Sequence, residues 1–232
     1  MSVLLLAALL ALPARGDAVA EVRRAADRDL PEAERLAAFE AAAAQGHGDA
    51  VRELALDASA DPRERWVAIR VLGRVGSPPA VEALQRLLAD PSAAIRAAAV
   101  AAAADTGRAD LAEPVAALLE DPATLVRTAA ADALAVFRQP RTVPYLERAL
   151  DDPTNTYRGQ SLWVRRHLVA AMGAIGDGSA LPALIRCLDD RDPAVSGAAL
   201  RALEQVTGLT WADGRTAAEE REAWKRWWAS RR

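Results

Sequence analysis

The chain has 232 residues, of which 52% are hydrophobic and 26% charged, and its formal net charge is −3 at pH 7. This length is enough for one elongated domain with its own core, and the negative balance argues against a general affinity for nucleic acid. The single cysteine, Cys187, lies in a leucine-rich segment and is expected to be a small buried hydrophobe, which excludes a disulfide within these residues.

Residues 1–20 have the features of a secretory signal peptide. The apolar run at residues 3–12 is too short to span a bilayer, and Pro13 interrupts it. Cleavage after Ala18 or Ala20 would fit the preference for small residues, although no basic residue precedes the run. We therefore expect a periplasmic or secreted protein. The alternative is a cytoplasmic protein in which this segment is an apolar first helix.

The acidic segment that follows is expected to form the N-terminal cap of the fold over residues 21–60. Ten Asp and Glu residues stand against five arginines between residues 17 and 60. Pro31 and the run at residues 46–48 divide the segment into three expected helices. A polar outer face is what the end of a repeat stack needs for solubility.

Residues 61–208 contain a repeat marked by five Asp-Pro dipeptides. The spacings between successive prolines are 29, 31, 31 and 40 residues. Each dipeptide opens an alanine-rich run, a break and then a leucine-rich run. This period predicts an all-α fold, an α-solenoid in which antiparallel helix pairs stack into a right-handed superhelix. The dipeptides begin at Asp61, Asp90, Asp121, Asp152 and Asp192.

The unit at residues 90–120 shows how the local sequence favours two helices. Asp90 is expected to cap the first helix, with Pro91 at its first helical position. Alanine has the highest helix propensity and dominates the body of this helix. Gly107 suits a left-handed C-terminal cap, and a second helix is expected at residues 109–120.

The pattern resembles HEAT-like or armadillo-type repeats, specifically the bacterial PBS-lyase HEAT-like repeats, a repeat type that bilin lyases share. The resemblance rests on the Asp-Pro openings, on the leucine-rich second helices and on Ile95-Arg96, Val126-Arg127, Val164-Arg165, Leu72-Gly73 and Met172-Gly173. It implies a buried Asp–Arg ladder along the stack, in which Arg96, Arg127 and Arg165 match the family's arginine. Trp66 and Ser196 occupy that position in the first and last units, so the resemblance implies a ladder interrupted at both ends.

The fourth unit carries an insertion of about seven residues within residues 153–163. Insertions in repeat proteins form loops on one face, often the binding face. Aromatic and arginine side chains are the types that dominate protein interfaces. We therefore predict that this segment binds another protein. The alternative is a solvated loop with Trp163 packed in the core. The candidate binding residues are Tyr157, Arg158, Gln160, Trp163, Arg166 and His167.

Residues 209–232 are expected to form a tryptophan-rich capping helix. Trp224, Trp227 and Trp228 share one face of a helix and could cover the last apolar seam. The alternative is an anchor at a membrane interface, with the basic residues facing lipid. The acidic residues between 219 and 222 argue against it, so no membrane contact is expected apart from the signal segment.

No arrangement of residues typical of catalysis is found. The chain has two histidines, His47 and His167, and no phosphate-binding, nucleophile or metal-binding motif, so no enzyme activity, metal or cofactor is expected. The sequence favours a non-enzymatic scaffold that binds another protein through its inner face and the insertion. Two alternatives are a lyase-like or chaperone-like accessory subunit acting on a cofactor-bearing protein, and a cytoplasmic adaptor. A ligand-sized hollow beside Tyr157, Arg166 and His167 would favour the accessory subunit.

Overall fold

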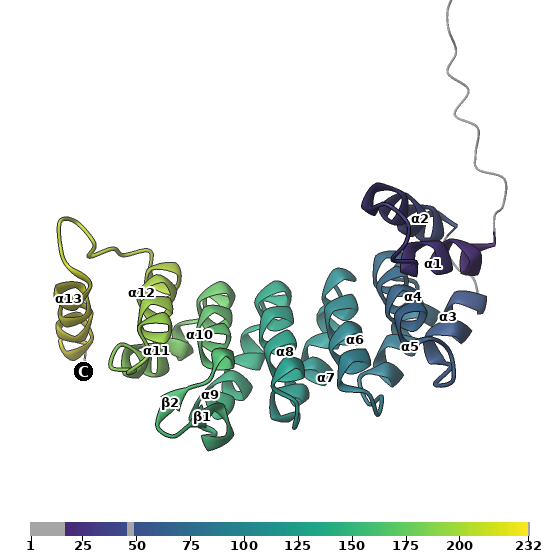
Figure 1. Ribbon diagram of the computed structural model, residues 1–232. Coiled ribbons are helices and arrows are strands. Elements are labelled where there is room, and N and C mark those ends of the chain that lie inside the picture. Colours follow the sequence, from purple (N-terminus) through teal and green to yellow (C-terminus); the bar gives the residue numbers. More distant parts are fainter. Residues whose placement is uncertain (1–16, 46–48, 232) are drawn as a thin grey trace, which may run out of the picture.

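The structure is a computed structural model that describes residues 17–45 and 49–231. Within these residues the fold is all-α apart from one two-stranded hairpin, with thirteen α-helices arranged as an elongated row (Figure 1). The α-solenoid predicted from the repeats is confirmed. Among the described residues, no helix combines the length and the apolar character that a membrane crossing requires.

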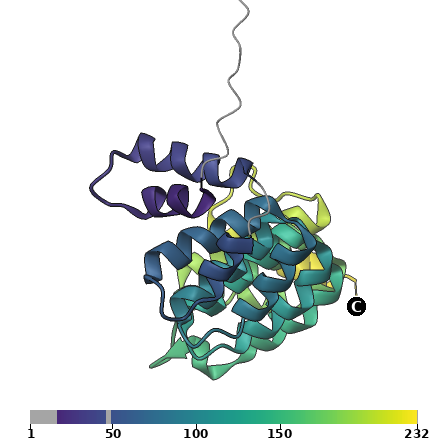
Figure 2. The same ribbon diagram turned by 90° about the vertical axis from the view of Figure 1, so that its right-hand side faces the viewer.

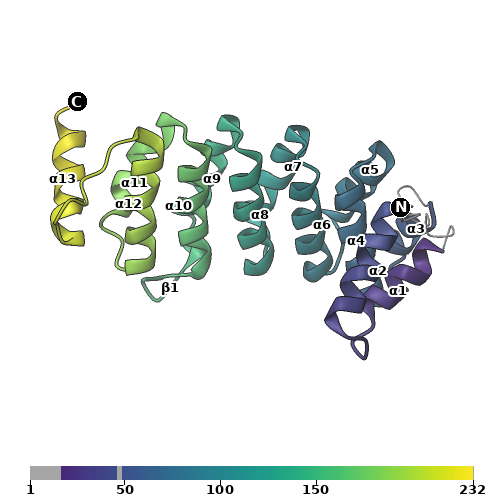
Figure 3. The ribbon, with the colours of Figure 1, turned by 90° about the horizontal axis from the view of Figure 1, so that it is seen from above.

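The repeats form two layers of helices, one above the other in Figure 1, and the first-layer helices lie side by side when the molecule is seen from above (Figure 3). The first layer consists of α4 (Pro62–Val75), α6 (Ala93–Asp105), α8 (Thr124–Phe137), α10 (Trp163–Ile175) and α12 (Pro193–Thr207). The second layer consists of α5 (Pro78–Leu87), α7 (Ala112–Ala117), α9 (Val143–Asp151) and α11 (Leu181–Cys187). Short 3-10 helices precede α7, α9 and α11 and follow α7; the longer break before α10 contains the insertion.

Three helices precede the repeats, as their sequence indicates: α1 (Ala18–Ala26), α2 (Glu32–Ala44) and α3 (Asp49–Leu56). The pair α1–α2 packs on α4 and stands to one side of the stack when the molecule is viewed from this end (Figure 2). Residues 1–16 of the expected signal segment lie outside the described residues. Ala18 and Ala20, the two expected cleavage positions, lie in the first turn of α1, whose N-cap Asp17 accepts a hydrogen bond from Val19 at 3.0 Å.

Small residues bring the first-layer helices close together. The alanines on the inner side of α6 are buried, and two glycines lie where neighbouring helices approach most closely. A Cβ atom added at Gly73 would lie 2.7 Å from the Cα of Ala102, and one added at Gly173 would lie 2.7 Å from the Cα of Ala202. Since both distances are shorter than real Cβ contacts, glycine is required at each position for the helices to approach this closely.

Leucines fill the space between the layers. One fully buried leucine from each second-layer helix or its 3-10 extension points into the core, namely Leu84, Leu119, Leu146 and Leu184. Burying a leucine side chain contributes roughly 1.5–3 kcal/mol. Because each helix pair shares this core with its neighbours, the apolar faces are covered only in the stack.

The Asp-Pro dipeptides do not all begin helices. Asp61 and Asp192 are N-caps, each followed by a proline at the first helical position, as predicted. The same prediction for Asp90 and Pro91 is wrong, because α6 begins at Ala93 with Ser92 as its N-cap. The second-unit dipeptide instead forms the turn before the helix. The break after α6 is as predicted, with Gly107 at φ +67°.

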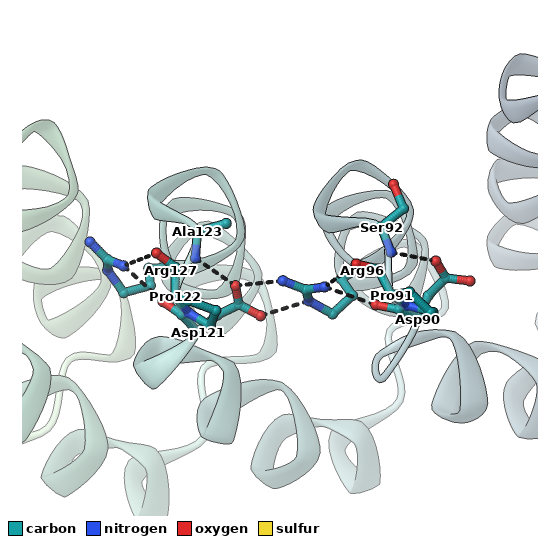
Figure 4. A network of polar contacts seen from close by, with 8 residues as sticks. All are labelled: Asp90, Pro91, Ser92, Arg96, Asp121, Pro122, Ala123 and Arg127. Atoms are coloured by element: carbon teal, nitrogen blue, oxygen red, sulfur yellow. Dashed lines mark hydrogen bonds and ion pairs between the residues drawn. The ribbon is translucent and has the colours of Figure 1, made fainter.

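Because an aspartate lies in the turn before α6 and in the turn before α8, its carboxylate can bind the preceding repeat as well as its own turn. In the third unit, one carboxylate oxygen of Asp121 accepts from the backbone N–H of Ala123 at 2.8 Å. Arg96 of the preceding unit donates to both oxygens of the same carboxylate at 2.7 and 2.8 Å (Figure 4). Arg96 also donates to the carbonyl of Asp90 at 2.8 Å. One guanidinium therefore joins a loop of its own repeat to the next repeat.

The ladder extends further toward the N-terminus than the resemblance implied. Arg65 donates to Asp90 at 2.6 Å, and both side chains are over nine-tenths buried. Trp66, which was aligned with the ladder position, is half exposed. The predicted interruption in the first unit is therefore wrong, because the arginine is displaced by one residue. In the last unit Ser196 is buried and its hydroxyl lies 3.4 Å from the carbonyl of Pro193, so the ladder ends there as expected.

The ladder lowers the pKa of Asp121. Burial raises the pKa of Asp121, but hydrogen bonds from Arg96 and Ala123 and the charges of Arg96 and Arg127 outweigh it, so this pKa lies below its ordinary value of 3.8. A carboxyl whose pKa is lowered by folding stabilises the fold above its unfolded pKa, and that contribution is lost as the pH falls through the folded pKa.

Tryptophans close the far end of the stack. Helix α13 (Ala217–Ala229) begins with a capping box formed by Thr216 and Glu219, and packs against α11 and α12. Trp224 is fully buried and meets the rings of Trp211 and Trp227 edge-on, with centroids 6.2 and 5.2 Å away. The ring of Trp224 therefore packs inside the protein and is not available to a lipid surface.

Replacing Gly173 by alanine should destabilise the protein by about 1–3 kcal/mol, because the new methyl group would overlap Ala202 and push α10 away from α12. The control is Gly197→Ala in α12, where an added Cβ would lie 3.8 Å from the nearest side-chain atom, in Arg201. That change should stabilise the helix by up to about 1 kcal/mol. Urea unfolding compares the two, and an equal effect of both substitutions would contradict the close packing.

Candidate functional site

The insertion in the fourth unit forms a short β-hairpin. The 3-10 helix η4 (Pro153–Asn155) leads into β1 (Thr156–Tyr157), which pairs with antiparallel β2 (Gln160–Ser161). The two residues between the strands, Arg158 and Gly159, have φ values of 50° and 76°. Positive φ at both positions is typical of a type I′ turn, the usual choice for a two-residue hairpin. The segment expected to be a loop is therefore an ordered hairpin beside the start of α10 (Figure 1).

The hairpin is attached to the ladder on both sides. Asn155 is fully buried, accepts from Arg127 Nε at 2.8 Å and donates to the carbonyl of Ala149 at 2.8 Å. On the other side, Ser161 donates to Asp190 at 2.8 Å, and Asp190 also accepts from Arg165 at 2.8 Å. Asn155, just before the hairpin, therefore replaces an aspartate as the acceptor of Arg127. Ser161 of the hairpin shares the next ladder aspartate, Asp190, with Arg165.

Asn155 changes the expected partner of Arg127. The aspartate of the fourth dipeptide, Asp152, accepts from the backbone N–H of Thr154 at 2.8 Å and caps η4. Arg127 instead uses the neutral amide of Asn155, together with the carbonyl of Asp121 at 2.8 Å. An amide can accept from arginine and donate to a carbonyl at the same time, which a carboxylate cannot do.

The six candidate residues lie in two adjacent groups. Tyr157 is 61% exposed at the hairpin, with the Arg158 guanidinium 5.2 Å from its ring centroid, and Gln160 lies opposite Tyr157. The other three residues begin α10. Trp163 is 59% exposed, so the alternative that it packs in the core is wrong.

The residues at the start of α10 form a stack. The Arg166 guanidinium carbon lies 3.1 Å from the centroid of the Trp163 ring, and the His167 ring centroid lies 5.6 Å from it. His167 Nδ1 is 2.5 Å from a carboxylate oxygen of Asp132 on α8. The histidine is therefore held by a neighbouring repeat, while the indole and the guanidinium are held against each other.

Two adjoining grooves lie beside these residues. A groove of about 380 Å³ between α10 and α12 is lined by Arg166, His167 and Arg201 among others. A second groove of about 450 Å³ between the hairpin and the start of α12 has Arg158, Gln160 and Arg191 in its lining. Pro193 lines both. Ligand-sized hollows are therefore present beside Arg166 and His167, whereas Tyr157 lines neither groove.

Arg191 and Arg201 belong to the site but were not singled out from the sequence. Both come from the last unit, whereas the insertion belongs to the fourth unit, so its sequence does not point to them. A signal was available for Arg201, which follows Ser196 by five residues, as Ala170 follows Arg165. Residues at one repeat position lie side by side in a stack, so Arg201 is expected beside Ala170 in the middle of α10.

The rest of the described chain offers no arrangement for metal binding. No group of three His, Cys, Asp or Glu residues in residues 17–45 and 49–231 could hold a metal ion. Burial raises the pKa of the Cys187 thiol to about 12, which keeps it protonated at neutral pH. His47 lies outside the described residues.

Comparisons with known proteins agree with this architecture. A family model described as HEAT repeats matches residues 49–110, 84–163 and 158–218. A chain from the complex of CpcE and CpcF of phycocyanin lyase from Nostoc sp. PCC7120 is similar, with a TM-score of 0.60 and 26% identity over 68% of this chain and 64% of that chain. The present chain thus spans somewhat less than two thirds of that protein.

Two engineered proteins share the fold. Their TM-scores are 0.53 and 0.52, at 20% and 22% identity over 82% of this chain, and the matches cover 89% and 53% of the engineered chains. A search among curated proteins finds no match.

Replacing Asn155 by alanine should loosen the hairpin, because Arg127 Nε and the Ala149 carbonyl would both lose a buried partner. We expect a loss of about 2 kcal/mol in unfolding free energy and faster amide exchange in residues 156–162. Thr156→Ala, which removes an exposed hydroxyl that donates to Pro153, is the control and should change little. Equal exchange in both variants would show that Asn155 does not anchor the hairpin.

Proposed function

This chain belongs to the HEAT-repeat family, and we propose that it is a non-enzymatic scaffold that binds another protein through the hairpin and the start of α10. The observation that carries the proposal is the exposed Trp163 ring with Arg166 stacked on it beside a groove. Tryptophan, tyrosine and arginine are the residues most enriched among those that dominate binding energy at protein interfaces.

The hairpin favours a preformed binding surface. Tyr157 is exposed on a strand whose turn and anchor are both defined, so little conformational entropy is lost when a partner binds. Two further large apolar side chains, Leu125 and Val136, are exposed on the neighbouring helix α8. Leu125 precedes Val126-Arg127 as Trp163 precedes Val164-Arg165, so these two side chains lie at matching positions of neighbouring helices.

The likeness to a chain of the CpcE and CpcF complex supports a role in a protein assembly. That protein is a subunit of a complex with a second protein. At 26% identity, and with 64% of that chain covered, the likeness supports the same general kind of role for this chain and leaves its partner open.

A second candidate function is that of a lyase-like or chaperone-like accessory subunit acting on a cofactor-bearing protein. The grooves beside Arg166 and His167 favour it, because they are large enough to hold part of a small molecule. Both candidate functions require a protein partner at the same surface.

Photo-crosslinking in cells of the source organism tests the binding surface. A photoreactive phenylalanine derivative at Tyr157 should give one discrete crosslinked protein, because this side chain projects from the hairpin. The matched control places the same group at Glu82, an exposed position in second-layer helix α5. Crosslinking at Tyr157 but not at Glu82, abolished by Trp163→Ala, is the expected result. Equal products at both positions, or none at Tyr157, would contradict the proposed function.

We also propose that the protein acts outside the cytoplasm, on the basis of the apolar run at residues 3–12 and the small residues that follow it. The intact mass of the protein purified from the source organism should then correspond to a chain that begins at Val19 or Glu21. A mass that includes Met1 or Ser2, in protein recovered from the cytoplasm, would contradict export and would favour a cytoplasmic adaptor.

A further inference from the structure

We infer that the two adjoining grooves bind an acidic segment of the partner protein, through the guanidinium groups of Arg158, Arg166, Arg191 and Arg201. This inference rests on the proposed function and adds the chemistry of the partner. Both grooves share Pro193, and their linings together hold these four arginines and one carboxylate, that of Asp192.

In the part of the chain that the structure describes, no carboxylate forms an ion pair with these four arginines, whereas several other surface arginines are paired. On the same first layer, Arg70 pairs with Asp105 at 2.7 Å. On the second layer, Arg86 pairs with Glu82 at 2.6 Å and Arg148 with Glu120 at 3.2 Å. Within the part of the chain that the structure describes, none of the four groove arginines has an ion pair of this kind. These four guanidinium groups are therefore available to carboxylates of a ligand.

Three acidic residues in or beside the grooves already have partners. Asp190 accepts from the groove residue Ser161 and from the ladder residue Arg165, both at 2.8 Å. Asp192 accepts from the backbone N–H of Ala194 at 2.8 Å and caps α12. Asp132 is held by His167 at 2.5 Å. None of these carboxylates forms an ion pair with a groove arginine, and the four arginines of the linings outnumber the one carboxylate there, that of Asp192. The grooves remain positive in a chain whose net charge is −3.

The arginines are arranged as one pair in each groove. Arg158 and Arg191 line the groove at the hairpin, where the position of a Cβ at Gly159 would lie 3.8 Å from Arg191 Nη1. Arg166 and Arg201 line the groove between α10 and α12. Guanidinium groups bind carboxylates through paired, charge-assisted hydrogen bonds. A segment with two acidic clusters would satisfy both pairs.

The apolar surroundings favour a peptide over a nucleic acid. Trp163 is exposed and stacks on Arg166, which lines the groove between α10 and α12. Helix α10 also packs against α8, which carries the exposed Leu125. An acidic peptide that carries an aromatic or aliphatic residue would contact both the arginines and this apolar surface.

Fluorescence anisotropy with a defined probe tests the inference. The probe is a short fluorescein-labelled peptide in which pairs of glutamates flank a tryptophan. The wild-type protein should bind it, and Arg166→Gln combined with Arg201→Gln should weaken binding by at least about tenfold. The control, Arg86→Gln combined with Arg148→Gln, removes the same charge from exposed second-layer positions and should change affinity by less than about twofold. Equal melting temperatures of the variants show that each is folded.

Each other outcome would overturn the acidic-segment proposal. These outcomes are no binding to the wild-type protein, an equal loss in the control variant, or tighter binding of a single-stranded oligonucleotide of equal charge. A lysine-containing version of the peptide should not bind the wild-type protein but should bind Arg166→Glu combined with Arg201→Glu. If crosslinking at Tyr157 succeeds and the acidic peptide fails, the scaffold function stands and only the chemistry assigned to the partner is wrong.

Discussion

A largely buried arginine that joins two consecutive repeats is the interaction on which the rest of the structure depends. In its clearest form, Arg96 donates to a carbonyl of its own repeat and to both carboxylate oxygens of Asp121 in the next. A buried ion pair of this kind adds little net stability compared with apolar packing, but leaving one partner alone costs several kcal/mol. Alanine faces alone would allow neighbouring helices to slide, so the ladder fixes the register of the stack.

The binding surface is built on the same interaction. Asn155 replaces an aspartate as the acceptor of Arg127, and Asp190 binds both Arg165 and the hairpin residue Ser161. The insertion therefore interrupts the repeat spacing without interrupting the ladder. This attachment places the hairpin against the last repeat, where arginines from two units line the adjoining grooves.

The sequence predicts the architecture well because each repeat encodes its helix pair locally. The period, the alanine and leucine runs and Gly107 all follow from propensity and capping. The position of Asp90 could not be predicted this way, because its carboxylate serves a neighbouring repeat as well as its own turn. The insertion predicts a binding surface at residues 157–167. The presence of Arg191 and Arg201 in the groove linings depends on packing between repeats. Propensity and spacing do not show which surface arginines lack a carboxylate.

A double-mutant cycle on Arg96 and Asp121, followed by urea unfolding at neutral pH, tests the role of the ladder most directly. With Arg96→Gln and Asp121→Asn we expect a coupling energy of about 1–3 kcal/mol, because each substitution leaves the other group buried without its partner. The exposed pair Arg148 and Glu120, treated in the same way, should give less than about 0.5 kcal/mol. A coupling for the buried pair no larger than that of the exposed pair would contradict the view that the ladder holds the repeats in register.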